Sequence, residues 1–133
     1  MSFNVTLVLC DKMLVSSSTL AAEIFNFAQS LAMATAHPTR DLEVRRVSTD
    51  DLAVTTSSGF EIQPTHCLNE SFRSDLIHLP AIWRNPRPII NRSERLLDWI
   101  SKQHRLNTIF TAVGTGVCFL AESGLLDNKP VTT

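Results

Sequence analysis

Residues 108–124 read Thr-Ile-Phe-Thr-Ala-Val-Gly-Thr-Gly-Val-Cys-Phe-Leu-Ala-Glu-Ser-Gly, and this stretch decides the fold. Its first six residues are mostly apolar or β-branched, which predicts a strand. Gly114-Thr-Gly116 then turns the chain directly into an apolar segment, 117–123, which predicts a helix that ends at Gly124. A strand followed at once by a helix is typical of α/β proteins.

The same alternation of strand and helix extends to both sides of this stretch. Residues 3–10 and 75–79 predict buried strands, and the alternating residues 42–47 predict another strand. Residues 52–63 predict a small hairpin around Ser57-Ser-Gly59. One helix is expected from an N-cap at Thr19 to about His37-Pro38, and another after a capping box of Asn91 and Glu94. The pattern predicts an α/β fold with a mainly parallel sheet and helices on both faces.

The composition limits the class of protein and its partners. The chain has 133 residues, which predicts a single domain, 1–133. Its formal net charge of −1 gives it no general attraction for DNA. Three widely spaced cysteines, at positions 10, 67 and 118, imply reduced thiols in a cytoplasmic protein. No segment predicts a signal or a membrane span, and the four histidines have no metal-ligand spacing. We therefore expect no metal and no cofactor.

The segment 111–133 resembles the ThiJ/PfpI class of amidotransferase-like domains, particularly the GlxA-type group. Its Gly124-Leu-Leu126 and Thr132-Thr133 match that family's pattern after the apolar helix. Towards the N-terminus, Glu23 and Phe25 match a second family segment, and residues 75–80 resemble the strand that ends in Pro-Gly-Gly. The resemblance implies a flavodoxin-like, amidotransferase-like fold. It covers about two-thirds of the family domain, so we expect a domain truncated at its C-terminus, where 130–133 begin another strand.

Three departures from the family pattern concern its catalytic site. Gly114 occupies the position of the family's nucleophilic cysteine, so no sulfur is present at the strand-to-helix turn. Ser17 replaces the acidic partner of that cysteine, and Pro80-Ala81-Ile82 replaces Pro-Gly-Gly. These three changes predict a pseudoenzyme without catalytic residues. Cys118 follows the turn by four residues, but its apolar neighbours favour a core position.

The resemblance then implies a ligand-sensing and dimerising domain of an AraC-type transcriptional regulator, which contacts DNA only through a missing C-terminal helix-turn-helix region. The alternative is a small cysteine-dependent hydrolase or amidase of the same superfamily; a third possibility is a scaffold or oligomerisation domain. The expected partners are a small-molecule effector and a second copy of the chain, with no membrane. In open parallel sheets ligands bind beyond the carboxyl ends of the strands. The candidate ligand-binding residues at that end are Ser17, Ala81, Ile82, Trp83, Gly114, Thr115 and Gly116.

An arginine-rich stretch surrounds Trp83. Its members are Arg84, Arg87, Arg92 and Arg95. The stretch is expected to be a solvated surface beside a proline-rich loop, with an anion or ligand contact near the mouth of the site as the alternative.

Overall fold

The computed structural model of the chain describes residues 2–35 and 40–132. Within these ranges four strands form one parallel sheet in the order β2-β1-β5-β6. The strands are β1 (Phe3–Leu9), β2 (Leu42–Ser48), β5 (Leu76–Leu79) and β6 (Ile109–Ala112). The prediction of an α/β fold with a mainly parallel sheet flanked by helices is confirmed.

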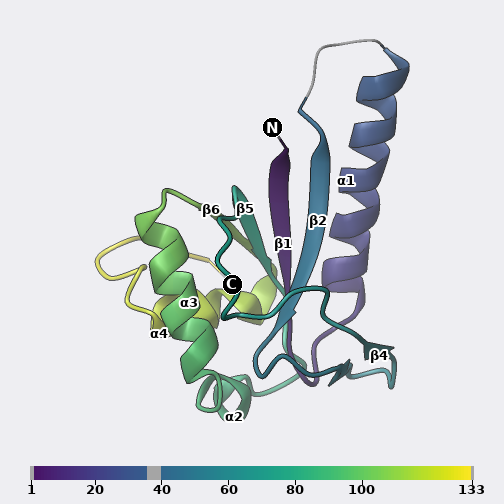
Figure 1. Ribbon diagram of the computed structural model, residues 1–133. Helices are drawn as coiled ribbons and strands as arrows, with labels where there is room; N and C mark the ends of the chain where they lie inside the picture. Colours follow the sequence, from purple (N-terminus) through teal and green to yellow (C-terminus); the bar gives the residue numbers. More distant parts are fainter. Residues whose placement is uncertain (1, 36–39, 133) are drawn as a thin grey trace.

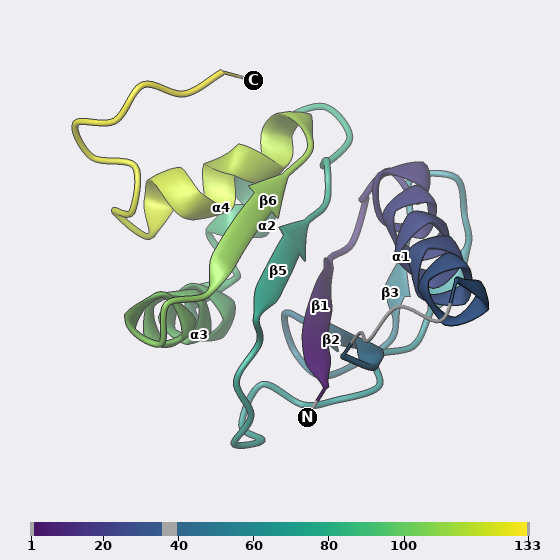
Figure 2. The ribbon, with the colours of Figure 1, turned by 90° about the horizontal axis from the view of Figure 1, so that it is seen from above.

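The helices lie on both sides of this sheet (Figures 1 and 2). Helix α1 (Ser16–Ala34) lies beside β1 and β2, whereas α3 (Glu94–Arg105) and α4 (Val117–Glu122) lie on the other side. A short helix, α2 (Arg87–Ile90), and a 3-10 turn, η1 (Gly114–Gly116), complete the helical segments of the described ranges. A two-stranded antiparallel hairpin, β3 (Val54–Thr55) and β4 (Glu61–Ile62), lies near the first turns of α1.

The core lies mainly between the sheet and the α3–α4 side. Strand β1 is buried on both faces from Val5 to Leu9, as its apolar sequence predicts. Leu96, Trp99 and Ile100 of α3 form the buried stripe of an otherwise polar helix, and Phe119 of α4 is fully buried. None of the helices in the described ranges combines the length and apolar character that a bilayer crossing requires.

Several helix boundaries differ from the sequence prediction. Thr19 is not an N-cap: α1 begins at Ser16, and the Thr19 hydroxyl donates to the carbonyl of Val15 at 3.0 Å. The expected capping box is also wrong, because Asn91 ends α2 and Ser93 precedes α3 without a capping hydrogen bond from its side chain. Helix α1 ends at Ala34, and the predicted end at 37–38 lies outside the described residues. Residues 130–132 form no strand, and Thr133 is not described.

Helix α1 carries its bulkiest apolar residues on the side away from the sheet. Leu20, Ile24, Phe27 and Leu31 recur at helical spacing, and each is more than half exposed. Apart from the half-buried Phe25, the opposite face presents small or polar residues: Ser18 and Ala22 border a groove, and the Gln29 side chain accepts a hydrogen bond from the Leu42 amide at 3.0 Å. The helix therefore leaves most of its larger side chains uncovered in this structure.

Candidate functional site

The loops that follow β1 and β5 are joined at the carboxyl end of the sheet, where the strand order reverses direction. The Leu14 amide donates to the Ala81 carbonyl at 2.8 Å, and the Trp83 amide donates to the Lys12 carbonyl at 2.9 Å. These bonds flank an isolated antiparallel bridge between Met13 and Ile82. In doubly wound sheets this reversal point opens the crevice in which ligands bind. Here its base is closed by backbone pairing.

The strand-to-helix turn after β6 approaches the same loop. Gly114 has a φ of 49°, in the left-handed region that favours glycine, and it is exposed. A Cβ atom built on Gly114 would meet only the Cβ of Ala81, at 3.8 Å. A Cβ on Gly116 would lie 2.5 Å from the carbonyl oxygen of Pro80. Gly116 therefore permits the turn and the Pro80 loop to touch backbone to backbone.

Two side-chain hydroxyl groups accept hydrogen bonds from backbone amides of the Pro80 loop. The Ala81 amide donates to Ser17 Oγ at 3.1 Å, and the Ile82 amide donates to Thr115 Oγ1 at 2.7 Å. Thr115 Oγ1 in turn donates to the Ile82 carbonyl at 2.9 Å. Amides of a loop in this position could otherwise stabilise an oxyanion. In this chain the two side chains already satisfy them.

His78 adds further hydrogen bonds at this junction, which were not predicted from the sequence. It lies on β5 and is 8% exposed, with one ring nitrogen 2.8 Å from Thr111 Oγ1 and the other 2.7 Å from the Ser17 carbonyl oxygen. It thereby links β6, β5 and the first turn of α1. Its position in an otherwise apolar strand could have identified it, because a buried polar side chain needs hydrogen-bond partners.

The structure brings all seven predicted site residues to this end of the sheet, but they differ in accessibility. Ala81, Ile82 and Gly116 are buried, so their side chains or Cα atoms face protein. Ser17 and Thr115 are half-buried and hydrogen-bonded to the loop, while Trp83 and Gly114 are exposed. Ligand binding at these residues stays a prediction.

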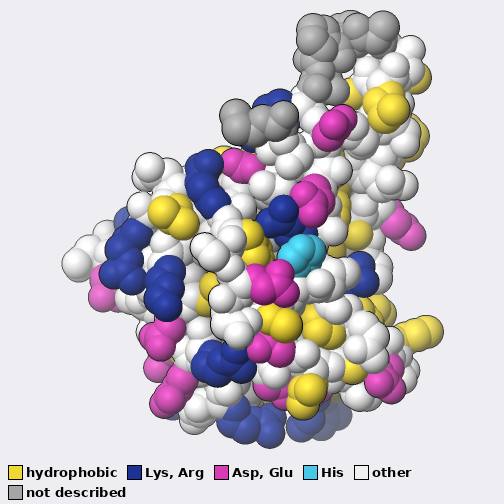
Figure 3. Space-filling model, viewed as in Figure 1, with side chains coloured by type: hydrophobic (Ala, Val, Ile, Leu, Met, Phe, Trp, Pro, Cys, Tyr) yellow, Lys and Arg dark blue, Asp and Glu magenta, His cyan; other side chains and the backbone are white. Residues whose placement is uncertain are grey.

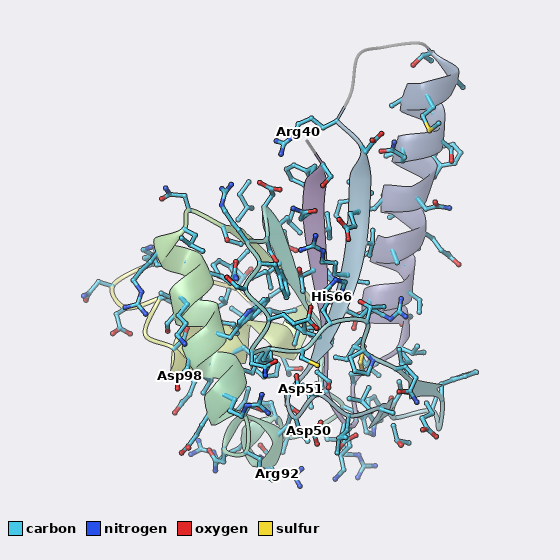
Figure 4. All side chains as sticks on the ribbon, viewed as in Figure 1. Arg40, Asp50, Asp51, His66, Arg92 and Asp98 are labelled. Carbon is cyan, nitrogen blue, oxygen red and sulfur yellow. The ribbon has the colours of Figure 1, made fainter. Side chains whose placement is uncertain are left out.

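The open space lies just outside this closed junction, in a groove of about 860 Å³ that we call the switch-point groove. Its lining comes from the loops after β1 and β5, the hairpin and α2: Asp11, Lys12, Thr55, Thr56, Ser57, Trp83, Arg84, Asn85, Pro88 and Arg92. Figure 3 shows Lys and Arg side chains gathered at the corresponding lower end of the molecule, where Figure 4 labels Arg92.

The switch-point groove combines positive charge with one exposed aromatic ring. Lys12, Arg84 and Arg92 line it against the single carboxylate of Asp11. The Arg84 guanidinium carbon lies 5.9 Å from the centre of the Trp83 ring, within the range of a cation–π contact. Trp83 and the arginines are predicted from the sequence, whereas Lys12 and the hairpin residues are not. The signal for Lys12 was its place directly after the first buried strand.

The other two predicted arginines point elsewhere. Arg95 forms an ion pair with Asp51 at 2.7 Å, and Arg87 borders a different groove. The arginine-rich stretch is therefore divided between the switch-point groove and the surface around it.

The three thiols have different surroundings. Cys10 is fully buried after β1, and burial together with the nearby Asp11 carboxylate raises the pKa of its thiol to about 12. Cys67 is half-buried, and desolvation followed by the charge of Asp51 also raises its pKa. Cys118 packs partly against the core and borders a groove of about 410 Å³ between α2 and α4. No cluster of three metal-ligating side chains occurs among the described residues.

Comparison with known proteins places the chain in a recognised family. Residues 12–133 match the DJ-1/PfpI family. Among curated proteins, isonitrile hydratase from Pseudomonas putida is 32% identical over 93 residues. That match covers 70% of this chain, which spans only 40% of the relative's length.

Solved structures with the same fold include regulators and other family members. A protein described as a transcriptional regulator from Vibrio parahaemolyticus superposes with a TM-score of 0.81 at 20% identity, over 96% of this chain and 64% of the other. An AraC family transcriptional regulator from Pseudomonas putida gives a TM-score of 0.70 at 20% identity, with the same two coverages. DJ-1beta of Drosophila melanogaster gives 0.73 at 19% identity, over 93% of this chain and 61% of the other. At these identities the likeness shows the fold.

The match with isonitrile hydratase contradicts one prediction from the sequence. We expected a pseudoenzyme, because Gly114, Ser17 and Ala81 replace residues of the family's catalytic site. The curated relative is an enzyme, which contradicts the expectation that this chain is not one, and the prediction is withdrawn.

Proposed function

The chain belongs to the DJ-1/PfpI family, and on this premise we propose that it is the ligand-sensing domain of an AraC-type transcriptional regulator of the GlxA group. The observation that carries the proposal is the switch-point groove, with Trp83 exposed in it. The two regulators that share this fold support the proposal.

The chemistry of the groove favours a small planar organic anion. Its lining has three cationic side chains and one carboxylate, so a carboxylate ligand gains a net attraction. The Trp83 ring offers a face on which a planar group can stack. The hydroxyls of Thr55 and Ser57 can supply hydrogen bonds along one wall, whereas that of Thr56 is buried and already accepts from the Phe60 amide at 3.0 Å.

The proposal extends to the partners of the whole protein. We place DNA contacts outside this chain, because its formal net charge of −1 gives no attraction for phosphate groups. A homodimer stays a prediction, supported by the apolar stripe on the outer face of α1. The free thiols of the three cysteines support a cytoplasmic location.

Benzoate tests the sensing proposal as a probe for planar carboxylates. We expect it to bind in the switch-point groove, and Trp83→Ala to weaken its affinity about tenfold, since stacking and cation–π contacts contribute about 1–2 kcal/mol. Isothermal titration calorimetry measures both affinities without relying on tryptophan emission. Trp83→Phe is the matched control, because it retains a planar ring and should weaken binding only about twofold.

Two results would count against this assignment. One is an affinity for benzoate that Trp83→Ala leaves unchanged. The other is binding that does not weaken at high salt, because contacts with Lys12 and Arg92 at the surface are screened by salt.

A cysteine-dependent enzyme is the second candidate function, and the match with isonitrile hydratase favours it. Gly114 supplies no sulfur, and Cys10 is buried with a raised pKa, which leaves Cys118 beside Arg87 and Glu122 as the thiol nearest an open groove. The assay follows consumption of an isonitrile, and separately of glutamine and methylglyoxal. Turnover that Cys118→Ser abolishes and Cys67→Ser preserves would favour this function over sensing alone.

A further inference from the structure

A second groove lies on the opposite side of the sheet from α3, under the first turns of α1. It has a volume of about 340 Å³ and shares no lining residue with the switch-point groove. Strands β1 and β2 form its floor, α1 forms one wall and the β3–β4 hairpin forms the other; most of its surface is apolar, from Leu7, Leu9, Ala22, Val44, Phe60 and Ile62. Figure 1 shows the hairpin and the start of α1 meeting beside these strands.

The groove exists because α1 places small side chains towards the sheet. Ser18 and Ala22 border the space, whereas Leu20 and Ile24, which could fill it, point to the outer side of the helix. Side chains one turn apart on a helix cover the same strip, so two small residues in succession leave a continuous hollow. The space follows from the order of residues in α1.

One residue that lines this groove has a buried hydroxyl without a partner among the described residues. Ser18 is 2% exposed, and its hydroxyl has no hydrogen bond among the described residues. A serine in a helix usually donates to the carbonyl four residues earlier. For Ser18 that acceptor is Leu14, whose oxygen already receives both the amide of Ser17, at 3.0 Å, and its hydroxyl, at 2.6 Å. The Ser18 hydroxyl therefore has no partner among the described residues, and because it is covered, a molecule in the groove reaches it only if the side chain rotates.

We infer that this groove binds a small, neutral, mainly apolar molecule that forms one hydrogen bond with Ser18. A cavity of about 150 Å³ holds a benzene ring in other proteins, so the volume here suits a bicyclic aromatic molecule. The rim carries one cation and one anion, Arg46 and Glu61, which gives an ionic ligand no net advantage. A buried hydroxyl without a partner costs stability, and the ligand supplies the missing partner.

Indole and its isosteric hydrocarbon indene test this inference, because only indole has an N–H group. In a ¹³C-methyl NMR titration of the whole chain, both should shift the methyl groups of Leu7, Val44 and Ile62. Indole should bind about fivefold more tightly than indene, which is the size of one net hydrogen bond. Ser18→Ala should bind indole and indene with about equal affinity. Its methyl spectrum should keep its dispersion, which shows that the variant is folded.

A second variant tests the space itself. Ala22→Phe fills the groove and should weaken indole binding at least about tenfold. Ala28→Phe is the matched control: it adds the same ring to the same helix at an exposed position and should leave binding unchanged. If Ala22→Phe fails to fold, the indole-to-indene ratio in Ser18→Ala still decides the question.

Three outcomes would overturn the inference. Indole binding could survive Ala22→Phe in a folded protein, or the shifts could appear around Trp83 of the switch-point groove instead. A second copy of the chain could also occupy the site. Sedimentation would then show a dimer in which the groove methyl groups are covered and indole produces no shifts.

Discussion

Replacing Gly116 with alanine should lower the free energy of unfolding by about 2–4 kcal/mol, as expected for overpacking against rigid backbone. The new Cβ would lie 2.5 Å from the Pro80 carbonyl oxygen and 2.9 Å from that of Leu79. Gly116 has a φ of −59°, where alanine is normally favoured by about 1 kcal/mol. The clash is the larger effect, because neither carbonyl can move without shifting the end of β5 and the loop that follows.

Urea unfolding of both proteins measures this difference, with Gly114→Ala as the control. At Gly114 a Cβ meets only the Ala81 Cβ at 3.8 Å, so that variant has only the strain of a positive φ, about 1 kcal/mol. If Gly116→Ala is as stable as the wild type, the turn and the Pro80 loop are too far apart for the new Cβ to clash with the Pro80 carbonyl oxygen. Because Trp83 follows this loop, Gly116→Ala should also weaken benzoate binding.

Most of the sheet could be predicted because local sequence determines it. The predicted strands 3–10, 42–47, 75–79 and 108–113 are short apolar, β-branched or alternating runs, and each corresponds to a strand of the structure. Gly124, predicted as the residue after the last helix, has a φ of 81°, and Leu125 packs against the core beside it. These features depend on residues close together in the chain.

Helix starts were less predictable because several polar residues competed for the capping position. Ser16, Ser17, Ser18 and Thr19 are all acceptable N-caps by type, and the structure begins the helix before any of them acts as one. The direction in which α1 turns its apolar stripe was equally open. Helical spacing identifies a stripe of residues such as Leu20 and Phe27, but does not say whether the sheet or another surface covers it.

The meeting of these loops could be predicted, but not how they are joined. From the rule that loops meet at the carboxyl ends of parallel strands, we expected Ser17, Ala81 and Gly114 to converge, and the structure places them side by side, while ligand binding there stays a prediction. It could not reveal that the junction is filled by hydrogen bonds, because Ser17 and Ala81 are 64 residues apart and their pairing depends on side-chain direction. The open groove consequently lies farther out, where Lys12 and the hairpin contribute to it.

We expect the Thr115 hydroxyl to hold the Pro80 loop in place through its two hydrogen bonds with Ile82. Thr115→Val keeps the shape of the side chain but leaves both the amide and the carbonyl of Ile82 without their only hydrogen bonds among the described residues. Ile82 is 2% exposed, so water replaces these bonds poorly. We expect the free energy of unfolding to fall by about 2 kcal/mol, the usual cost of unpaired buried backbone groups.

Hydrogen exchange at the Ile82 amide distinguishes this local effect from general destabilisation. In Thr115→Val that amide should exchange faster than amides of β1, whose ladder bonds are untouched. Thr115→Ser keeps the hydroxyl, so it should preserve protection at Ile82 and cost less than about 1 kcal/mol. Unchanged protection in Thr115→Val would show that another group binds the Ile82 amide. Faster exchange together with weaker benzoate binding would instead connect this hydroxyl to the position of Trp83, since the Pro80 loop carries the tryptophan into the groove.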